Sequence, residues 1–206
     1  MKKNNSFTDF LIKINAAKEL TLVGPFAATR AEWPSPCVFI DGGNRHQTKN
    51  PLHYSVGDGD SAWAPVDHLL PEEKDYSDLA FVLSLLPDHI SRLSLVGFLG
   101  GRRDHEFINL GEIHRFLKGR VTAAECNIDF SVCAYSAGKW SLDLKGIFSI
   151  LALEPADVRL LGSCRYQIPV TQPLTPLSSH GLSNEGWGIV ELTASNPVFV
   201  FKNPFT

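Results

Sequence analysis

The sequence of 206 residues has few of the features that mark membrane, secreted or nucleic-acid-binding proteins. Its formal net charge is −3 and no run of Lys or Arg is longer than the opening pair Lys2-Lys3, so we expect no nucleic acid partner. No apolar run approaches the roughly 18 residues of a membrane helix, and no apolar signal segment follows the two lysines. We therefore expect a soluble, cytoplasmic protein that binds no membrane.

Cysteine is also scarce, and its pattern excludes the usual cysteine-based sites. The four cysteines lie far apart, form no Cys-x-x-Cys pair and mostly sit in apolar stretches (Cys37, Cys126, Cys133 and Cys164). Free cysteine in such a setting behaves as a small apolar residue, so we expect reduced core side chains. The histidines are equally scattered, and we expect no zinc site.

In the first half of the chain, short apolar runs alternate with helical patterns. The apolar runs end in glycine, as strands of a buried parallel sheet do, at residues 20–24, 37–43, 54–57 and 92–97. Helices are expected over residues 6–18, over 78–86 with Ser77 as the N-cap, and after Asp104, where apolar residues recur at helical spacing. This alternation predicts an α/β domain, Rossmann-like and with a mostly parallel sheet, over residues 1–120.

After about residue 120 the pattern changes to short strands broken by Gly, Pro and Ser, with no long amphipathic helix. Separate strands are expected at residues 140–144, 148–153, 158–161, 189–192 and 198–201. We predict an all-β domain over residues 121–206, folded as a small sandwich.

Acidic side chains follow the predicted strands. In Gly57-Asp-Gly-Asp-Ser61, Asp58 and Asp60 can aim two carboxylates at one Mg²⁺, the ligand type that this ion prefers. A solvated Asp-Gly turn would have the same sequence. Asp75 and Asp78 flank Ser77 before a helix, so one can face a metal while the other caps the helix; helix capping alone would also explain them.

The segment Gly97-Phe-Leu-Gly-Gly-Arg-Arg-Asp-His105 has the composition of a phosphate-binding loop. Glycines allow close backbone approach to a phosphate, and the N-terminus of the following helix attracts anions. Arg102 or Arg103 could then hold phosphate oxygens in a bidentate fork. The alternative is an exposed cluster of ion pairs.

The order of these segments resembles the thiamin pyrophosphokinase family. The resemblance rests on Val38–Gly43, Ser55–Ser61, Lys74–Leu79 and Gly97–Asn109, and it continues in the second half with Phe148–Leu153, Gly162–Tyr166 and Gly181–Glu185. It spans roughly residues 20 to 203. It implies a transferase that moves pyrophosphate from ATP to thiamin with Mg²⁺ and releases AMP. It also implies a homodimer, with thiamin held where the α/β domain of one subunit meets the β domain of the other.

The resemblance also assigns roles to residues. It implies Mg²⁺ ligands at Asp58, Asp60, Asp75 and Asp78, and catalytic roles for Asp58, Asp60, Asp78, Arg102 and Asp104. The nucleotide is expected at Asp41, Gly42, Gly100, Gly101, Arg102, His105 and Asn109, and thiamin at Tyr166, Ser183 and Asn184.

The chain departs from the family pattern in three places that bear on activity and substrate. Gly59 replaces a bulky residue in the acidic turn, Ser163-Cys164 replaces a Leu-Lys pair beside the aromatic residue, and residues 167–176 are rich in proline. Two alternatives therefore stand beside the main prediction. The acceptor is another heterocyclic alcohol such as a hydroxymethylpterin, or the protein binds thiamin or nucleotide without turnover.

Overall fold

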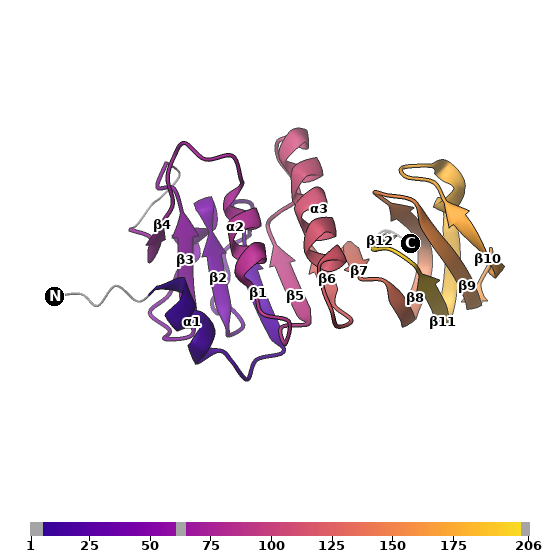
Figure 1. Ribbon diagram of the computed structural model, residues 1–206, viewed down its shortest axis with the longest axis horizontal. Coiled ribbons are helices and arrows are strands. Elements are labelled where there is room, and N and C mark those ends of the chain that lie inside the picture. The colour runs from indigo at the N-terminus through magenta and orange to yellow at the C-terminus, as the bar shows by residue number, and fades with distance from the viewer. Residues whose placement is uncertain (1–5, 61–64, 203–206) are drawn as a thin grey trace. The chain divides into compact units, whose positions relative to one another are not determined.

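The computed structural model describes residues 6–60 and 65–202, and the chain divides into two compact units, Met1–Glu112 and Ile113–Thr206 (Figure 1). The division falls inside helix α3 (Arg103–Lys118), eight positions before the predicted boundary at 120. The assignment of separate functions to the two parts stays a prediction. Each unit is described by itself below.

The first unit contains a parallel sheet. Its strands lie in the order β5-β1-β2-β3-β4, and each pairs with its neighbour in parallel: β1 (Glu19–Val23), β2 (Cys37–Ile40), β3 (His53–Gly57), β4 (His68–Leu69) and β5 (Arg92–Val96). All residues of β2 and β3 are buried, as expected for strands covered on both faces. The carboxyl ends of parallel strands lie at one edge of the sheet, which brings the segments that follow β1, β2, β3 and β5 to that edge.

Helices of the first unit begin at side-chain caps. In α1 (Phe7–Lys13), Ser6 and Asp9 form a reciprocal capping box, and the helix ends five residues earlier than predicted. Ser77 caps α2 (Asp78–Leu85) as predicted, because its Oγ accepts a hydrogen bond from Ala80 N at 3.1 Å. Among residues 6–60 and 65–202, no helix has both the length and the apolar character needed to cross a membrane.

The second unit is antiparallel. Its strands follow the order β10-β9-β11-β8-β12-β7-β6, with antiparallel pairing throughout: β6 (Glu125–Ile128), β7 (Val132–Tyr135), β8 (Gly138–Ala152), β9 (Ala156–Cys164), β10 (Ile168–Leu174), β11 (Asn184–Ala194) and β12 (Val198–Lys202). A short 3-10 helix, η2 (Ser179–Gly181), precedes β11.

One strand prediction for this unit needs correction, and three of its strands had no counterpart in the sequence prediction. The predicted strands 140–144 and 148–153 are parts of the single strand β8, because Gly146 continues the pairing with a φ of 82°. The proline-rich stretch forms β10, which is an edge strand in the described sheet, where proline costs no ladder hydrogen bond. Strands β6 and β7 had no counterpart in the sequence prediction.

Buried side chains from β7 to β12 form one core cluster in the second unit, and Trp140 and Ile168 pack against it. The strands therefore share a common interior. The fold is mixed α/β with most of its regular structure in strands, whereas the Rossmann-like and sandwich layouts stay predictions.

The four cysteines are buried and free, as predicted. Burial raises the pKa of the Cys37 thiol to about 12. The Cys37 side chain is therefore a neutral thiol at neutral pH and is not activated as a nucleophile.

Candidate active site

Three carboxylates come together after strands β2 and β3. Asp41 begins the 3-10 helix η1 (Asp41–His46), Asp58 follows β3, and Asp60 lies two residues later. One oxygen from each of the three lies within 4.8 Å of the others. This donor set matches what Mg²⁺ prefers, a few carboxylates with room for water and phosphate oxygens.

The backbone of these segments is shaped to place the carboxylates. Asp41 adopts a φ of 53°, which turns the chain sharply at the end of β2. Gly59 has a φ of 90°, so a side chain there would strain this turn. Glycine is therefore the residue type that this turn conformation favours, and with Gly59 in the turn both Asp58 and Asp60 lie in the carboxylate cluster. Ser61, the last residue of the acidic motif, lies outside the described residues.

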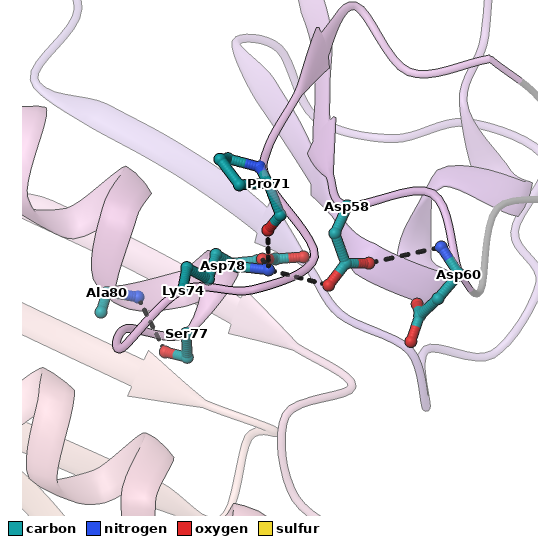
Figure 2. Close-up of polar contacts among 7 residues, drawn as sticks. All are labelled: Asp58, Asp60, Pro71, Lys74, Ser77, Asp78 and Ala80. Carbon is teal, nitrogen blue, oxygen red and sulfur yellow. Dashed lines mark hydrogen bonds and ion pairs between the residues drawn. The ribbon is translucent and has the colours of Figure 1, made fainter.

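The side chain of Lys74 connects Asp58 of the carboxylate cluster with Asp78 of the second acidic segment. Lys74 Nζ lies 2.8 Å from Asp58 Oδ2 and 3.1 Å from Asp78 Oδ1, and it donates a hydrogen bond to the carbonyl oxygen of Pro71 at 3.0 Å (Figure 2). Only 8% of the Lys74 side chain is exposed. The lysine is thus a buried cation held by two carboxylates and a carbonyl.

The pKa values in this group follow from burial and the lysine. Burial raises the pKa of Asp58, but hydrogen bonds from Lys74 and from Asp60 outweigh it and lower the pKa below its ordinary value. Burial also raises the pKa of Asp78, and there Lys74 offsets it only in part, so the pKa of Asp78 stays raised. The pKa of Lys74 is raised because its hydrogen bonds with Asp58 and Asp78 outweigh the effect of burial.

The four predicted metal ligands therefore differ in position. Asp58 and Asp60 belong to the cluster, and Asp41, predicted for the nucleotide, joins them. Asp78 is buried and bound to Lys74, while Asp75 is exposed and lies outside the cluster in the part of the chain that the structure describes.

The glycine-arginine segment lies between β5 and α3. Gly100 N donates a hydrogen bond to Glu106 Oε1 at 2.6 Å, and Glu106 Oε2 accepts from Arg103 at 2.8 Å. Arg102 makes a forked ion pair with Asp104, with Nε at 3.2 Å and a terminal nitrogen at 2.5 Å. The hydrogen bond from Arg102 lowers the pKa of Asp104 to about 2. In this state the backbone and arginine donors expected for phosphate are bound by carboxylates of the same segment.

The other predicted nucleotide residues lie around this loop. His105 N donates to Asp104 Oδ1 at 3.1 Å, and Asn109 Nδ2 donates to the carbonyl oxygen of Phe98 at 2.9 Å, which fastens the loop to α3. Gly101 contacts Phe26, since an added Cβ would lie 2.3 Å from its ring. Gly42 is buried beside Asp41.

The predicted thiamin residues lie in the second unit, and two of them are bound to each other. Asn184 Oδ1 accepts from Tyr166 N at 2.9 Å and from Glu185 N at 2.9 Å, and Asn184 Nδ2 donates to the carbonyl oxygen of Tyr166 at 2.7 Å. Asn184 is buried, whereas 57% of Tyr166 is exposed. Asn184 thus holds the backbone of Tyr166 and presents the ring to solvent.

A cavity of about 250 Å³ lies beside this pair in the second unit. Its walls are mainly apolar, with Ile150, Leu160 and Leu192, and polar groups at Tyr166, Gln167, His180 and Asn184. Ser183, the third predicted thiamin residue, does not line it; this serine has a φ of 57°, and its N–H donates to Ser149 Oγ at 3.1 Å. The cavity has the apolar walls and few polar groups that are typical of a site for a small organic ligand.

Comparison with solved structures identifies the fold. Thiamine pyrophosphokinase from Bacillus subtilis superposes with a TM-score of 0.67 at 19% identity, covering 91% of this chain and 100% of that one. The chain has the fold of the thiamin pyrophosphokinases. The enzyme from Geobacillus thermodenitrificans gives a TM-score of 0.64 at 18% identity over 91% and 99% of the two chains, and that from Candida albicans gives 0.65 at 11% over 92% and 90%. No protein-family model and no curated sequence matches the chain.

The resemblance read from the sequence motifs is thus confirmed at the level of the thiamin pyrophosphokinase fold. Two residues in the candidate site had no role in the sequence prediction, Lys74 and Glu106. Glu106 could have been found from its position in the first turn of α3, where acidic residues bind free backbone N–H groups. For Lys74 the only local signal is its i,i+4 spacing to Asp78, because its other carboxylate partner, Asp58, is 16 residues away.

Proposed function

We propose that the protein is a Mg²⁺-dependent thiamin pyrophosphokinase, which transfers pyrophosphate from ATP to the hydroxyl group of thiamin and releases AMP. One observation carries the proposal: the carboxylate oxygens of Asp41, Asp58 and Asp60 lie within 4.8 Å of one another where β2 and β3 end. Ligands of parallel sheets bind at this edge. The likeness in fold to thiamin pyrophosphokinases supports the choice of reaction.

Asp41, Asp58 and Asp60 would hold Mg²⁺, which supplies positive charge that offsets the charge on the phosphates. Asp60 is the exposed member of the three and is therefore the carboxylate best placed to orient an attacking hydroxyl. Asp78 contributes through Lys74, and Asp75 has no direct ligand role in this proposal. Of the four metal ligands predicted from the sequence, this proposal keeps Asp58 and Asp60, and it adds Asp41.

Arg102 and the Gly100–Gly101 backbone would bind ATP phosphates. The Arg102 side chain is 72% exposed, so it can exchange Asp104 for a phosphate without unfolding anything. The Gly100 N–H would likewise exchange the Glu106 carboxylate for a phosphate oxygen. Asp104 and Glu106 then keep these donors in position while the nucleotide is absent.

In the second unit, Tyr166 would stack on the acceptor, with Asn184 holding it in place. An electron-rich ring face suits the cationic thiazolium of thiamin. We further propose the family's homodimer, a cytoplasmic location, and a sandwich arrangement of β6 to β12.

The test is direct. Purified protein incubated with ATP, Mg²⁺ and thiamin should release AMP and form thiamin diphosphate, and chromatography measures both products. Chelation of the metal should stop the formation of both. Absence of AMP with all three components present would contradict the proposal. The result would favour a protein that binds thiamin or nucleotide without turnover.

A second candidate is the same transfer to a different heterocyclic alcohol, such as a hydroxymethylpterin. Arg165 favours it, because its guanidinium lies 5.3 Å from the centre of the Tyr166 ring and already occupies one cation-binding face. An uncharged flat ring would stack there without repulsion from Arg165. Comparing AMP release with thiamin and with a hydroxymethylpterin separates the two acceptors.

A further inference from the structure

Lys74 places a positive charge beside the carboxylates of the acidic site. It precedes α2, and its ammonium group reaches Asp58 at 2.8 Å, Asp78 at 3.1 Å and the Pro71 carbonyl at 3.0 Å (Figure 2). An ammonium group has three N–H donors, and these three acceptors can take all of them. The side chains of Lys74 and Asp78 are 8% and 9% exposed, so the contact is shielded from solvent.

The lysine uses only one side of Asp58. Asp58 Oδ2 bonds to Lys74, whereas Oδ1 lies on the side of Asp60, whose N–H is 3.4 Å away (Figure 2). A carboxylate held at one oxygen has its other oxygen fixed in direction, as in the outer-shell contacts that orient metal ligands. The bond from Lys74 therefore orients Asp58 while leaving an oxygen for a cation.

We propose that Lys74 is a resident counter-cation of the metal site: it holds Asp58 and Asp78 together when no metal is bound, and its charge weakens the affinity for the divalent cation. This inference rests on the proposed function, because it assumes that Asp41, Asp58 and Asp60 bind Mg²⁺. It assigns Lys74 a positioning role through Asp58 and no contact with substrate.

Two opposite effects follow from removing the lysine. Without metal, a Lys74→Met variant has Asp78 buried beside Asp58 with no compensating cation, so the variant should unfold at a lower temperature than the wild type. With metal, the variant lacks a positive charge that repels the ion at close range. It should bind Mn²⁺ about tenfold more tightly and gain more thermal stability from Mg²⁺ than the wild type does.

The experiment measures thermal unfolding of both proteins in chelator and in saturating Mg²⁺, and Mn²⁺ binding by calorimetry, all without ATP or thiamin. The double variant Lys74→Met/Asp78→Asn removes one charge of each sign. It should recover most of the lost stability and return the metal response to that of the wild type. Lys118→Met, which removes a lysine bound to Glu154 in the second unit, should leave the metal response unchanged.

The inference is overturned if Lys74→Met gains no more from Mg²⁺ than the wild type, or if neither protein responds to metal. It is also overturned if the double variant keeps the enlarged metal response of Lys74→Met. These readouts need no turnover. A chain that shows the expected metal responses but releases no AMP would contradict the proposed function alone.

Discussion

The two units place their functional side chains in different ways. In the first unit the three clustered carboxylates and Arg102 stand on turns that follow parallel strands. Each of these turns contains a positive φ, at Asp41 after β2, at Gly59 after β3 and at Gly100 after β5. In the second unit, Asn184 begins strand β11 and its side chain is bound to the backbone beside Tyr166. In the first unit the exposed polar side chains can contact a ligand directly. In the second unit the polar side chain of Asn184 instead holds the backbone that carries the Tyr166 ring.

This difference separates effects on rate from effects on stability. A side chain that is exposed and held by few contacts can be changed at little cost to folding. A buried side chain with several hydrogen bonds leaves unpaired groups behind when it is removed. Substitutions of the exposed residues Asp60 and Arg102 in the first site should therefore lower activity and spare the fold. Substitution of the buried Asn184 should lower stability, and it should weaken acceptor binding only through the loss of its hold on Tyr166.

The largest expected effect is that of Asp60→Asn in the first unit. The change removes a charged ligand from the Asp41–Asp58–Asp60 group, and we expect kcat to fall about a thousandfold or more. Thermal unfolding should hardly change, because Asp60 is the exposed member of the group. Asp75→Asn is the matched control: it removes an exposed carboxylate outside the group and should keep near-wild-type AMP release. Equal losses in both variants would contradict the narrowed metal site.

Arg102→Ala should follow, with kcat/KM reduced about a hundredfold through lost phosphate binding. Because Arg102 and its partner Asp104 are both largely exposed, no measurable change in unfolding temperature is expected. Arg103→Ala removes the neighbouring arginine, whose partner is Glu106, and should have a smaller effect on rate. If Arg103→Ala lost more kcat/KM than Arg102→Ala, Arg103 and not Arg102 would be the residue that contacts the phosphates.

Gly43→Ala probes the tight backbone packing of the first unit at the cluster. A Cβ at Gly43 would lie 2.1 Å from the carbonyl oxygen of Val23, so backbone would have to move. We expect a loss of about 2–4 kcal/mol in the free energy of unfolding, measured with denaturant. Gly119→Ala is the control, since its Cβ would meet its nearest neighbour at 3.5 Å, an ordinary contact.

The sequence predicted the local features of both sites better than their connections. The turn residues, the cap at Ser77 and the acidic positions depend on neighbours within a few residues, which a sequence displays directly. The bond from Lys74 to Asp58 spans 16 residues and that from Asn184 to Tyr166 spans 18, and only the folded chain brings these pairs together. Strand β8 is a further example: Gly146 interrupts its apolar pattern, so the sequence indicates two strands. Only the pairing with the distant strand β11 shows that it is one strand.

Asn184→Ala tests the second unit's side of the comparison. The substitution leaves the Tyr166 and Glu185 N–H groups without this acceptor and leaves the Tyr166 carbonyl with the weak Cys164 Sγ donor in place of the amide, so we expect a loss of about 2 kcal/mol in unfolding free energy. The KM for the acceptor should rise together with this loss, because the Tyr166 ring is no longer held. If Asn184→Ala raised KM but left denaturant unfolding unchanged, the residue would be a substrate contact and not a positioning one.

The smallest expected effect is a difference in pH dependence between the buried histidines of the two units. Burial lowers the pKa of His53, and it lowers that of His114 although Glu154 Oε1, 3.3 Å away, opposes the shift. A lowered pKa in the folded state means that the unfolded chain takes up the proton first. The stability is therefore complete above about pH 6.5 and falls as the pH drops from there toward the folded-state pKa.

Denaturant unfolding of His53→Gln and His114→Gln at about pH 7 and about pH 5.5 measures each contribution as a flattened pH dependence. Glu154→Gln provides the sharper comparison, because it removes the carboxylate that favours the charged imidazole of His114. The pKa of His114 should then fall further, and stability should decrease more steeply on acidification than in the wild type. His53 has the hydroxyl partners Ser35 and Thr48, so its contribution should be unaffected by the Glu154 variant. An unchanged slope in Glu154→Gln would mean that Glu154 does not offset the lowering of the His114 pKa by burial.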